Sequence, residues 1–282
     1  MATIVTSRGC PYKCLFCSRV AISDRVRFRD PKLVVDEIES LRDDYRDITF
    51  LDDTFTLKKS HTLALCEEMI KRNLKMKWTC NTRANLLDEE MVSKMKQAGC
   101  DMILIGIESG DEELRNDIVH KKITDEDIRK AVAICKKVKI TVGGYFMLGF
   151  PEEKQIQMTK TVEYPKKYKL DIMSIHATTI YPGSELFNLA QKENKQNYLD
   201  LWYKYARGEK KLDDLPLVYV PKGMEFSDIE KARKKAYFIF YARPSFIIKQ
   251  IIKDLRSFED FKRDFFQAVR IFRFGKTSKD LK

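Results

Sequence analysis

Short apolar runs alternate with longer amphipathic stretches along the first 180 residues of the chain. Each run is bounded by polar residues or glycine, which is typical of buried parallel strands. The predicted strands span residues 2–6, 48–51, 77–81, 102–107, 141–148 and 172–179. The stretches between most of them are long enough for the crossover helices that parallel strands require.

Three of the intervening stretches begin with recognisable helix signals. Asp30 can cap a helix with Pro31 in its first turn, and Asp88 precedes two glutamates. Thr124 and Asp127 match a capping box ahead of an apolar face. About six strand–helix units require parallel strands, and right-handed crossovers curl such a sheet towards a barrel. Because an eightfold barrel needs two more units, we predict an α/β fold, an open, partial (β/α)6 barrel.

The alternation of strands and helices ends near Gly183. Residues 184–194 have a helical pattern, whereas residues 195–223 are polar and predict an irregular connection. We therefore expect two domains: a barrel core at 1–183 and an α-helical C-terminal extension at 184–282.

The C-terminal extension combines aromatic residues with positive charge. Ser227 and Glu230 predict a capping box, Pro244 is expected to end that helix, and Ser257 to open another with phenylalanines on one face. Residues 221–282 hold 16 basic and eight acidic residues. The aromatic face can pack on the core, or the basic helices can lie on an anionic membrane surface, which would suit a lipid substrate. Nucleic acid is a less favoured partner, because no strand pattern of an RNA-binding barrel follows the core.

Composition places the protein among soluble globular chains. Its 282 residues are 44% hydrophobic and 34% charged, with a net charge of +11, so a core can form beneath a charged surface. No apolar run approaches the roughly 18 residues of a membrane span, and the first residues lack the pattern of a signal peptide. We expect a cytoplasmic protein, with association to a membrane surface as a further option.

Three of the seven cysteines directly follow the first predicted strand. Cys10, Cys14 and Cys17 have the spacing C-x3-C-x2-C. Three thiolates on a short loop can hold three irons of a cubane cluster and leave the fourth iron to a non-protein ligand. Structural zinc would lack one ligand, so zinc with a distant fourth ligand, or three incidental cysteines, are weaker alternatives. The other four lie in helix or strand patterns and are expected to be buried: Cys66, Cys80, Cys100 and Cys135.

Together with Phe16, the three cysteines resemble the cluster motif of the radical S-adenosylmethionine superfamily. The resemblance implies a 4Fe–4S cluster whose open iron binds the amino and carboxylate groups of S-adenosylmethionine. Reductive cleavage would then give a 5′-deoxyadenosyl radical that takes a hydrogen atom from the substrate. The backbone of Phe16 would approach the adenine.

Polar residues at the ends of later strands fit the same resemblance, because barrel sites form at the carboxyl ends of strands. The implied cofactor-binding residues are Asp52 and Asp53 for the methionine amino group, Arg83 for a carboxylate, Glu108 with Ser109 for the methionyl or ribose part, and Gly149 on the adenine side. Other readings remain open: the aspartates can cap a helix, Arg83 can form a salt bridge, and Gly149 can serve a turn. His176, on the sixth strand, is either a substrate-facing residue or a core histidine.

Several phrases of the sequence, such as Gly106-Ile107-Glu108-Ser109-Gly110, resemble the cobalamin-dependent branch of the superfamily. In that branch a cobalamin-binding domain precedes the radical core, but only nine residues precede Cys10 here and no Asp-x-His-x-x-Gly signature is present. We therefore do not expect this chain alone to bind cobalamin.

The predicted function is a radical S-adenosylmethionine enzyme that abstracts hydrogen from a lipid-like or other small molecule. The alternatives are a non-catalytic iron–sulfur scaffold and a methyltransferase subunit that depends on a partner with a cobalamin domain. An external electron donor such as flavodoxin or ferredoxin is the expected partner.

Overall fold

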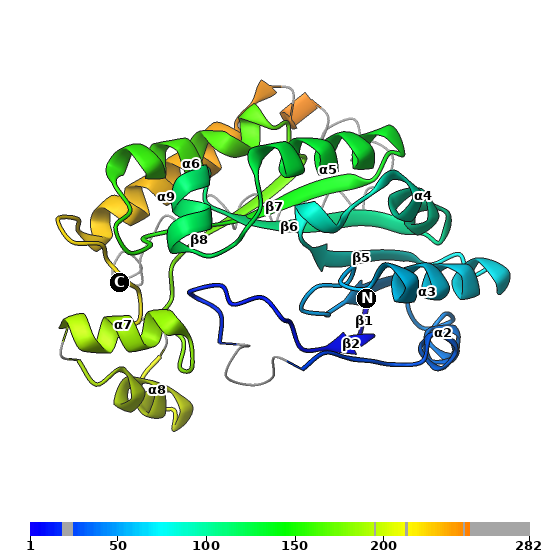
Figure 1. Ribbon diagram of the computed structural model, residues 1–282, viewed down its shortest axis with the longest axis horizontal. Helices are drawn as coiled ribbons and strands as arrows, with labels where there is room; N and C mark the ends of the chain where they lie inside the picture. Colours follow the sequence, from blue (N-terminus) through cyan, green and yellow to red (C-terminus); the bar gives the residue numbers. More distant parts are fainter. Residues whose placement is uncertain (19–24, 195, 212–213, 245, 249–282) are drawn as a thin grey trace.

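The computed structural model describes residues 1–18, 25–194, 196–211, 214–244 and 246–248. Six parallel strands form one sheet in the order β1-β4-β5-β6-β7-β8 (Figure 1). They span Ala2–Ile4, Asp47–Phe50, Lys77–Thr82, Cys100–Glu108, Thr141–Leu148 and Ile172–Ala177. The described part of the sheet stays open, because β1 and β8 lie at opposite ends of this order. The predicted partial barrel is therefore confirmed. Two short strands, β2 (Ser7–Arg8) and β3 (Arg27–Phe28), form a separate antiparallel pair.

Helices cover the outside of the sheet, where α2 to α6 form an arc in Figure 1. The helices are α2 (Pro31–Ser40), α3 (Lys59–Lys71), α4 (Glu89–Gln97), α5 (Asp125–Lys137), α6 (Gln155–Lys167), α7 (Glu185–Asn194), α8 (Tyr198–Ala206) and α9 (Phe226–Tyr241). Asp30, Asp88 and Thr124 cap α2, α4 and α5 through their side chains, as predicted. A short 3-10 helix, η1 (Ala84–Leu86), and a π-helix, η2 (Leu114–Ile118), follow β5 and β6.

The strands alternate between a buried outer face and a half-buried inner face. On the outer face, Phe50, Trp78 and Ile103 are fully buried against residues of the covering helices. The four scattered cysteines belong to the same buried core, as expected: Cys66, Cys80, Cys100 and Cys135. In the part of the chain that the structure describes, no helix is long and apolar enough to cross a membrane.

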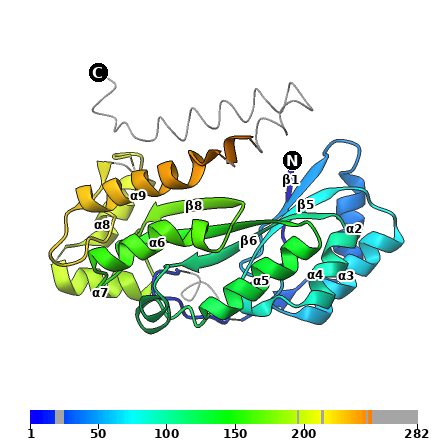
Figure 2. The same ribbon diagram turned by 90° about the horizontal axis from the view of Figure 1, so that it is seen from above.

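Helix α9 covers the outer edge of β8, the last strand of the sheet (Figure 2). The Tyr241 hydroxyl lies 3.1 Å from the amide nitrogen and 2.7 Å from the carbonyl oxygen of Met173. Tyr237 makes the same pair of contacts to Ile175, at 3.3 and 3.4 Å. The spacing matches because four helical residues rise about 6 Å and two strand residues about 6.6 Å. Two tyrosines thus satisfy an edge that would otherwise expose unpaired backbone groups.

We expect Tyr241→Phe to lower the free energy of unfolding by about 1–3 kcal/mol, because it leaves the buried backbone groups of Met173 without a partner. Urea unfolding followed by circular dichroism measures the change. The matched control is Tyr203→Phe, since the Tyr203 side chain is 54% exposed. Equal losses in the two variants would contradict this role of Tyr241.

The C-terminal extension differs from the prediction at two places. The connection predicted to be irregular contains α8, which Asn197 caps by accepting a hydrogen bond from Asp200 N–H. Its apolar side includes Trp202, whose ring lies 5.3 Å from that of Tyr181. The N-cap of helix α9 lies two residues before the predicted one, Ser227: Glu225 occupies it, and the Glu225 amide donates to the Asp228 carboxylate at 3.0 Å.

Helix α9 ends at Tyr241, before Pro244, as predicted. The helix predicted from Ser257 lies outside the described residues.

Candidate functional site

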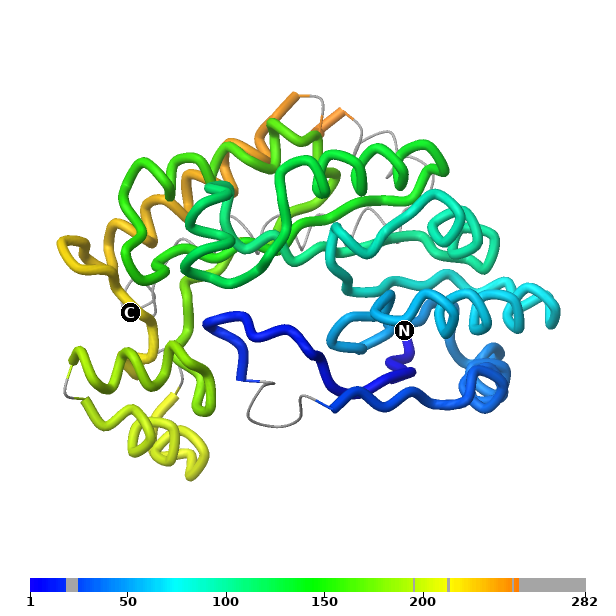
Figure 3. Tube along the Cα trace, viewed as in Figure 1, coloured from blue at the N-terminus to red at the C-terminus, as the bar shows by residue number. Residues whose placement is uncertain are grey.

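The three clustered cysteines lie on the loop that follows β2, here called the cluster loop (residues 9–18). Figure 3 shows this dark blue loop running from the first strand towards α7. Leu15 anchors it on two sides, because its amide donates to the carbonyl of Val119 at 3.1 Å and its carbonyl accepts from the amide of Leu186 at 3.0 Å. A turn with a 3.0 Å bond from Cys17 N to Cys14 O brings the last two cysteines close in space.

The loop offers thiols suited to an iron–sulfur cluster. Cys14 is buried, and Cys10 and Cys17 are half-buried. Burial raises the pKa of the Cys14 thiol above its ordinary value, and the nearby cations of Lys121 and Arg83 offset only part of this rise. Among the described residues, no three His, Cys, Asp or Glu side chains converge on one point that could hold a single metal ion. A cubane makes no such demand, because each thiolate binds a different iron, so the donor set fits a 4Fe–4S cluster.

Asp52 and Asp53, after β4, hold the start of the cluster loop. Asp52 is 2% exposed and its carboxylate accepts hydrogen bonds from Thr6 N (2.7 Å), Thr6 Oγ1 (2.6 Å) and Ser7 Oγ (2.6 Å). Asp53 accepts from Gly9 N at 3.2 Å. Asp52 thus holds the segment just before the cluster loop, and Asp53 holds the first residue of the loop. Their contact with the cofactor remains a prediction.

Arg83, after β5, lies beneath the cluster loop. Its guanidinium carbon is 3.6 Å from the ring centre of Tyr12, and one of its terminal nitrogens donates to the carbonyl of Lys121. The side chain is buried, and its Nε has no hydrogen-bond partner among the described residues. A buried donor without a partner is costly, so Nε is suited to a bound anion such as a carboxylate.

Glu108, at the end of β6, forms a buried ion pair with Lys121. Lys121 Nζ lies 2.8 Å from Glu108 Oε1, and the side chains are 9% and 8% exposed. Glu108 has φ 69° beside an irregularity in the pairing of β6 and β7, a conformation that costs about 1–3 kcal/mol and occurs at functional sites. A Cβ on Gly106 would lie 2.6 Å from both Oε1 and Nζ, so a larger residue there would displace the two paired groups.

Ser109 turns its hydroxyl into the protein. Ser109 Oγ accepts from the amide of Asp111 at 3.1 Å and lies 3.4 Å from Thr161 Oγ1. These contacts hold the turn after Glu108, while contact of Ser109 with the cofactor remains a prediction.

Phe16 lies near Phe150, the residue that follows Gly149; Phe16 and Gly149 were both predicted on the adenine side. The rings of Phe16 and Phe150 are 6.0 Å apart. Gly149 has φ 87°, and a Cβ there would lie 2.7 Å from Ile229 Cδ1, so glycine is required for backbone conformation and for the packing of α9.

Glu153 was not among the predicted site residues, yet it shapes this turn. Its carboxylate accepts from Gly149 N at 2.6 Å and Phe150 N at 3.0 Å. Burial raises the pKa of Glu153 to about 7. Its position four residues after Gly149 is a local signal that could have identified it.

His176 is exposed on the inner face of β8 and is not part of the buried core. Its Nε2 lies 2.7 Å from Ser174 Oγ, and it pairs in register with Met147 of β7. It lies towards the carboxyl end of the strand, on the face opposite the helices.

Lys121 and Tyr12 were also missed by the sequence analysis. Tyr12 lies within the cysteine motif, where its aromatic ring was a usable signal. Lys121 lies in a loop between η2 and α5 without a motif, so only the structure reveals its contact with Glu108.

Comparisons with known proteins agree with this geometry. The model of the radical SAM superfamily matches residues 4–164. An uncharacterized methyltransferase of Pyrococcus horikoshii is 32% identical over 253 residues, which cover 89% of this chain and 53% of the relative. An anaerobic magnesium-protoporphyrin IX monomethyl ester cyclase of Rubrivivax gelatinosus is 33% identical over 186 residues, covering 64% of this chain and 33% of the relative. The chain thus spans about half, or less, of these relatives.

Two solved structures share the fold. The radical S-adenosylmethionine methyltransferase TsrM from Kitasatospora setae, with cobalamin and a [4Fe-4S] cluster bound, aligns with a TM-score of 0.63 at 23% identity and covers 68% of this chain and 37% of its own. The cobalamin-dependent S-adenosylmethionine radical enzyme OxsB aligns with a TM-score of 0.60 at 17% identity. The alignment covers 93% of this chain and 45% of the OxsB chain.

Enzymes of this superfamily bind a 4Fe–4S cluster and S-adenosylmethionine and need an external reductant. The matched family model covers more than half of the chain, the cysteine loop lies within the matched residues, and the open six-stranded sheet is the fold shared with the solved structures. The chain therefore belongs to the radical SAM superfamily.

Proposed function

We propose that Cys10, Cys14 and Cys17 hold the cluster, and that S-adenosylmethionine binds between the cluster loop and the carboxyl ends of β5 to β7. The observation that carries the proposal is the direct contact between this loop and the strand ends. Tyr12 stacks on Arg83, and Leu15 is bonded to the carbonyl of Val119.

When bound, the reduced cluster and S-adenosylmethionine supply a 5′-deoxyadenosyl radical for hydrogen abstraction. The role of the chain's own residues is to bind and orient S-adenosylmethionine. The unpartnered Nε of Arg83 is suited to a carboxylate, and the Glu108 carboxylate to a hydroxyl or ammonium group. Phe16 and Phe150 offer apolar surface to an adenine ring.

The residues on the inner face of the sheet favour a substrate whose contacting part is uncharged. Residues in register across this face are half-buried and carry no permanent charge: Thr49, Thr79 and Met102; Asn81 and Leu104; Tyr145 and Ser174; Met147 beside the exposed His176. A charged group placed there would lose water without gaining an opposite charge. His176 lies nearest the cofactor end of this face and is the proposed polar contact with the substrate.

Methyl transfer with cobalamin supplied by another domain or chain is the second candidate. It is favoured by the 32% identity to a protein named as a methyltransferase and by the fold shared with cobalamin-containing enzymes. In that case the residues that bind the cluster and S-adenosylmethionine would stay the same.

The proposal is tested on anaerobically reconstituted protein, reduced with dithionite or with flavodoxin or ferredoxin as donor. We expect the electron paramagnetic resonance signal of a 4Fe–4S cluster to shift when S-adenosylmethionine is added, and 5′-deoxyadenosine to be released slowly even without substrate. A signal that S-adenosylmethionine leaves unchanged, with no cleavage, would support the scaffold alternative. Formation of S-adenosylhomocysteine only after cobalamin is added would favour methyl transfer.

A further inference from the structure

The loop between η2 and α5 is built to hold one lysine in a fixed place. At the ends of this Lys121 loop (residues 119–123), Asn116 of η2 and Ile123 exchange two hydrogen bonds of 2.9 Å, from Nδ2 to the carbonyl and from the amide to Oδ1. The residues on either side of Lys121 both have positive φ: His120 at 58° and Lys122 at 53°. Such conformations are costly for non-glycine residues and persist only where the surroundings impose them.

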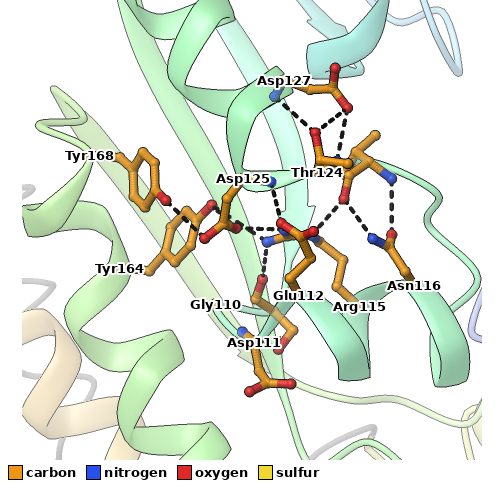
Figure 4. Close-up of polar contacts among 12 residues, drawn as sticks. Gly110, Asp111, Glu112, Arg115, Asn116, Thr124, Asp125, Asp127, Tyr164 and Tyr168 are labelled. Carbon is orange, nitrogen blue, oxygen red and sulfur yellow. Dashed lines mark hydrogen bonds and ion pairs between the residues drawn. The ribbon is translucent and has the colours of Figure 1, made fainter.

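Arg115 fastens the Lys121 loop to the strand end that carries Glu108. Its guanidinium is completely buried and donates to the carbonyls of Ile123 (3.1 Å) and Ser109 (2.9 Å) and to Asp125 (2.6 Å). Figure 4 shows Arg115 at the centre of these contacts. Ile123 closes the loop and Ser109 directly follows Glu108, so one side chain fixes the backbone on both sides of the Glu108–Lys121 pair.

The Lys121 loop touches three parts of the proposed cofactor site. Lys121 Nζ donates to Glu108, and the Lys121 carbonyl accepts from Arg83. The carbonyl of Val119 accepts from Leu15 of the cluster loop. Among the residues that the structure describes, Lys121 is the donor to Oε1 of Glu108 and none donates to Oε2.

We propose that Lys121 is a positioning residue for S-adenosylmethionine: it occupies Glu108 Oε1, fixes the carboxylate, and leaves Oε2 to a hydroxyl or ammonium group of the cofactor. The inference rests on the proposed function. A buried carboxylate without its cation would lose its charge or its orientation, so Glu108 depends on Lys121 to act as an acceptor. The same lysine holds Arg83 through its carbonyl, which places the carboxylate-binding cation relative to Glu108.

The test is a titration of S-adenosylmethionine against the electron paramagnetic resonance signal of the reduced, reconstituted full chain. We expect Lys121→Met to keep the iron content and the signal seen without the cofactor, but to need about ten- to hundredfold more S-adenosylmethionine for the shift, the range of one charge-assisted hydrogen bond. Lys121→Arg should restore part of the affinity. The matched control is Lys122→Met, which removes the same charge from the adjacent, exposed side chain and should bind like the wild type.

Wild-type affinity in Lys121→Met would overturn the inference alone, whereas a wild-type protein without any shift would overturn the proposed function and the inference with it. Loss of iron from a folded Lys121→Met variant would also overturn it, by assigning Lys121 to cluster retention. If the unpaired Glu108 prevents folding, the double variant Glu108→Gln/Lys121→Met removes the buried charge. We expect that variant to hold the cluster and bind the cofactor weakly, and wild-type affinity there would refute the role of the pair.

Discussion

Cys14→Ala is expected to abolish the iron–sulfur cluster. Cys14 is the middle ligand of the proposed set and the most buried of the three, held by the turn that connects it to Cys17. A cubane attached through two thiolates has a second iron open to solvent and is labile, so the variant should lose the cluster during reconstitution and desalting. Iron and sulfide analysis, together with the visible absorption of the cluster, measures the loss.

Cys100→Ala is the matched control, because it removes a thiol of the buried core, 1% exposed and far from the cluster loop in sequence. Its iron content per folded chain should equal that of the wild type. A full complement of iron in Cys14→Ala would refute the ligand assignment. A loss of one cluster in Cys100→Ala would instead show that the core cysteines bind metal.

The sequence predicted the core of this fold well, because local chemistry determined most of its elements. Thr141–Leu148 was predicted with its exact bounds, and Asp30, Asp88 and Thr124 cap helices as expected. Helix α8 was missed although Tyr198, Leu201, Trp202 and Tyr205 follow a helical period. Its many charged and polar neighbours obscured a pattern that becomes clear once Trp202 is seen to pack on Tyr181.

Only those residues of the candidate site that belong to recognisable motifs were predicted from the sequence. The cysteines, Phe16, Arg83, Glu108 and Gly149 lie at one edge of the sheet because the carboxyl ends of parallel strands share that edge. The contacts between these residues could not be predicted, since each joins segments far apart in sequence. Lys121 reaches Glu108 from a loop whose shape depends on the positive φ angles of His120 and Lys122. Neither residue is a glycine, the residue type that most often indicates a positive φ angle in a sequence.

Arg115→Met is expected to lower the free energy of unfolding by about 2–4 kcal/mol, because it removes a charge-assisted hydrogen bond to Asp125 and the donor to the carbonyl of Ser109. Arg115 is completely buried and pairs with Asp125, which also accepts from the hydroxyls of Tyr164 (2.7 Å) and Tyr168 (2.8 Å). Partial burial of Asp125 favours its neutral form, but hydrogen bonds from Arg115 and both tyrosines outweigh it and lower the pKa of the carboxyl. Methionine would leave the carbonyl of Ser109 without this donor, and the Asp125 carboxylate without its cation and with the two tyrosine hydroxyls alone.

Urea unfolding followed by circular dichroism measures this loss, and Arg129→Met is its control. Arg129 also pairs with a carboxylate at 2.6 Å, that of Glu126, but its side chain is 62% exposed. An exposed pair contributes at most about 1 kcal/mol because water solvates both charges when it breaks. The two variants therefore differ in the burial of the ion pair and in the backbone contacts of Arg115, and similar losses would show that the network around Arg115 adds little to stability. A large loss confined to Arg115→Met would mean that the loop carrying Lys121 is held in place by the same interactions that hold the barrel together.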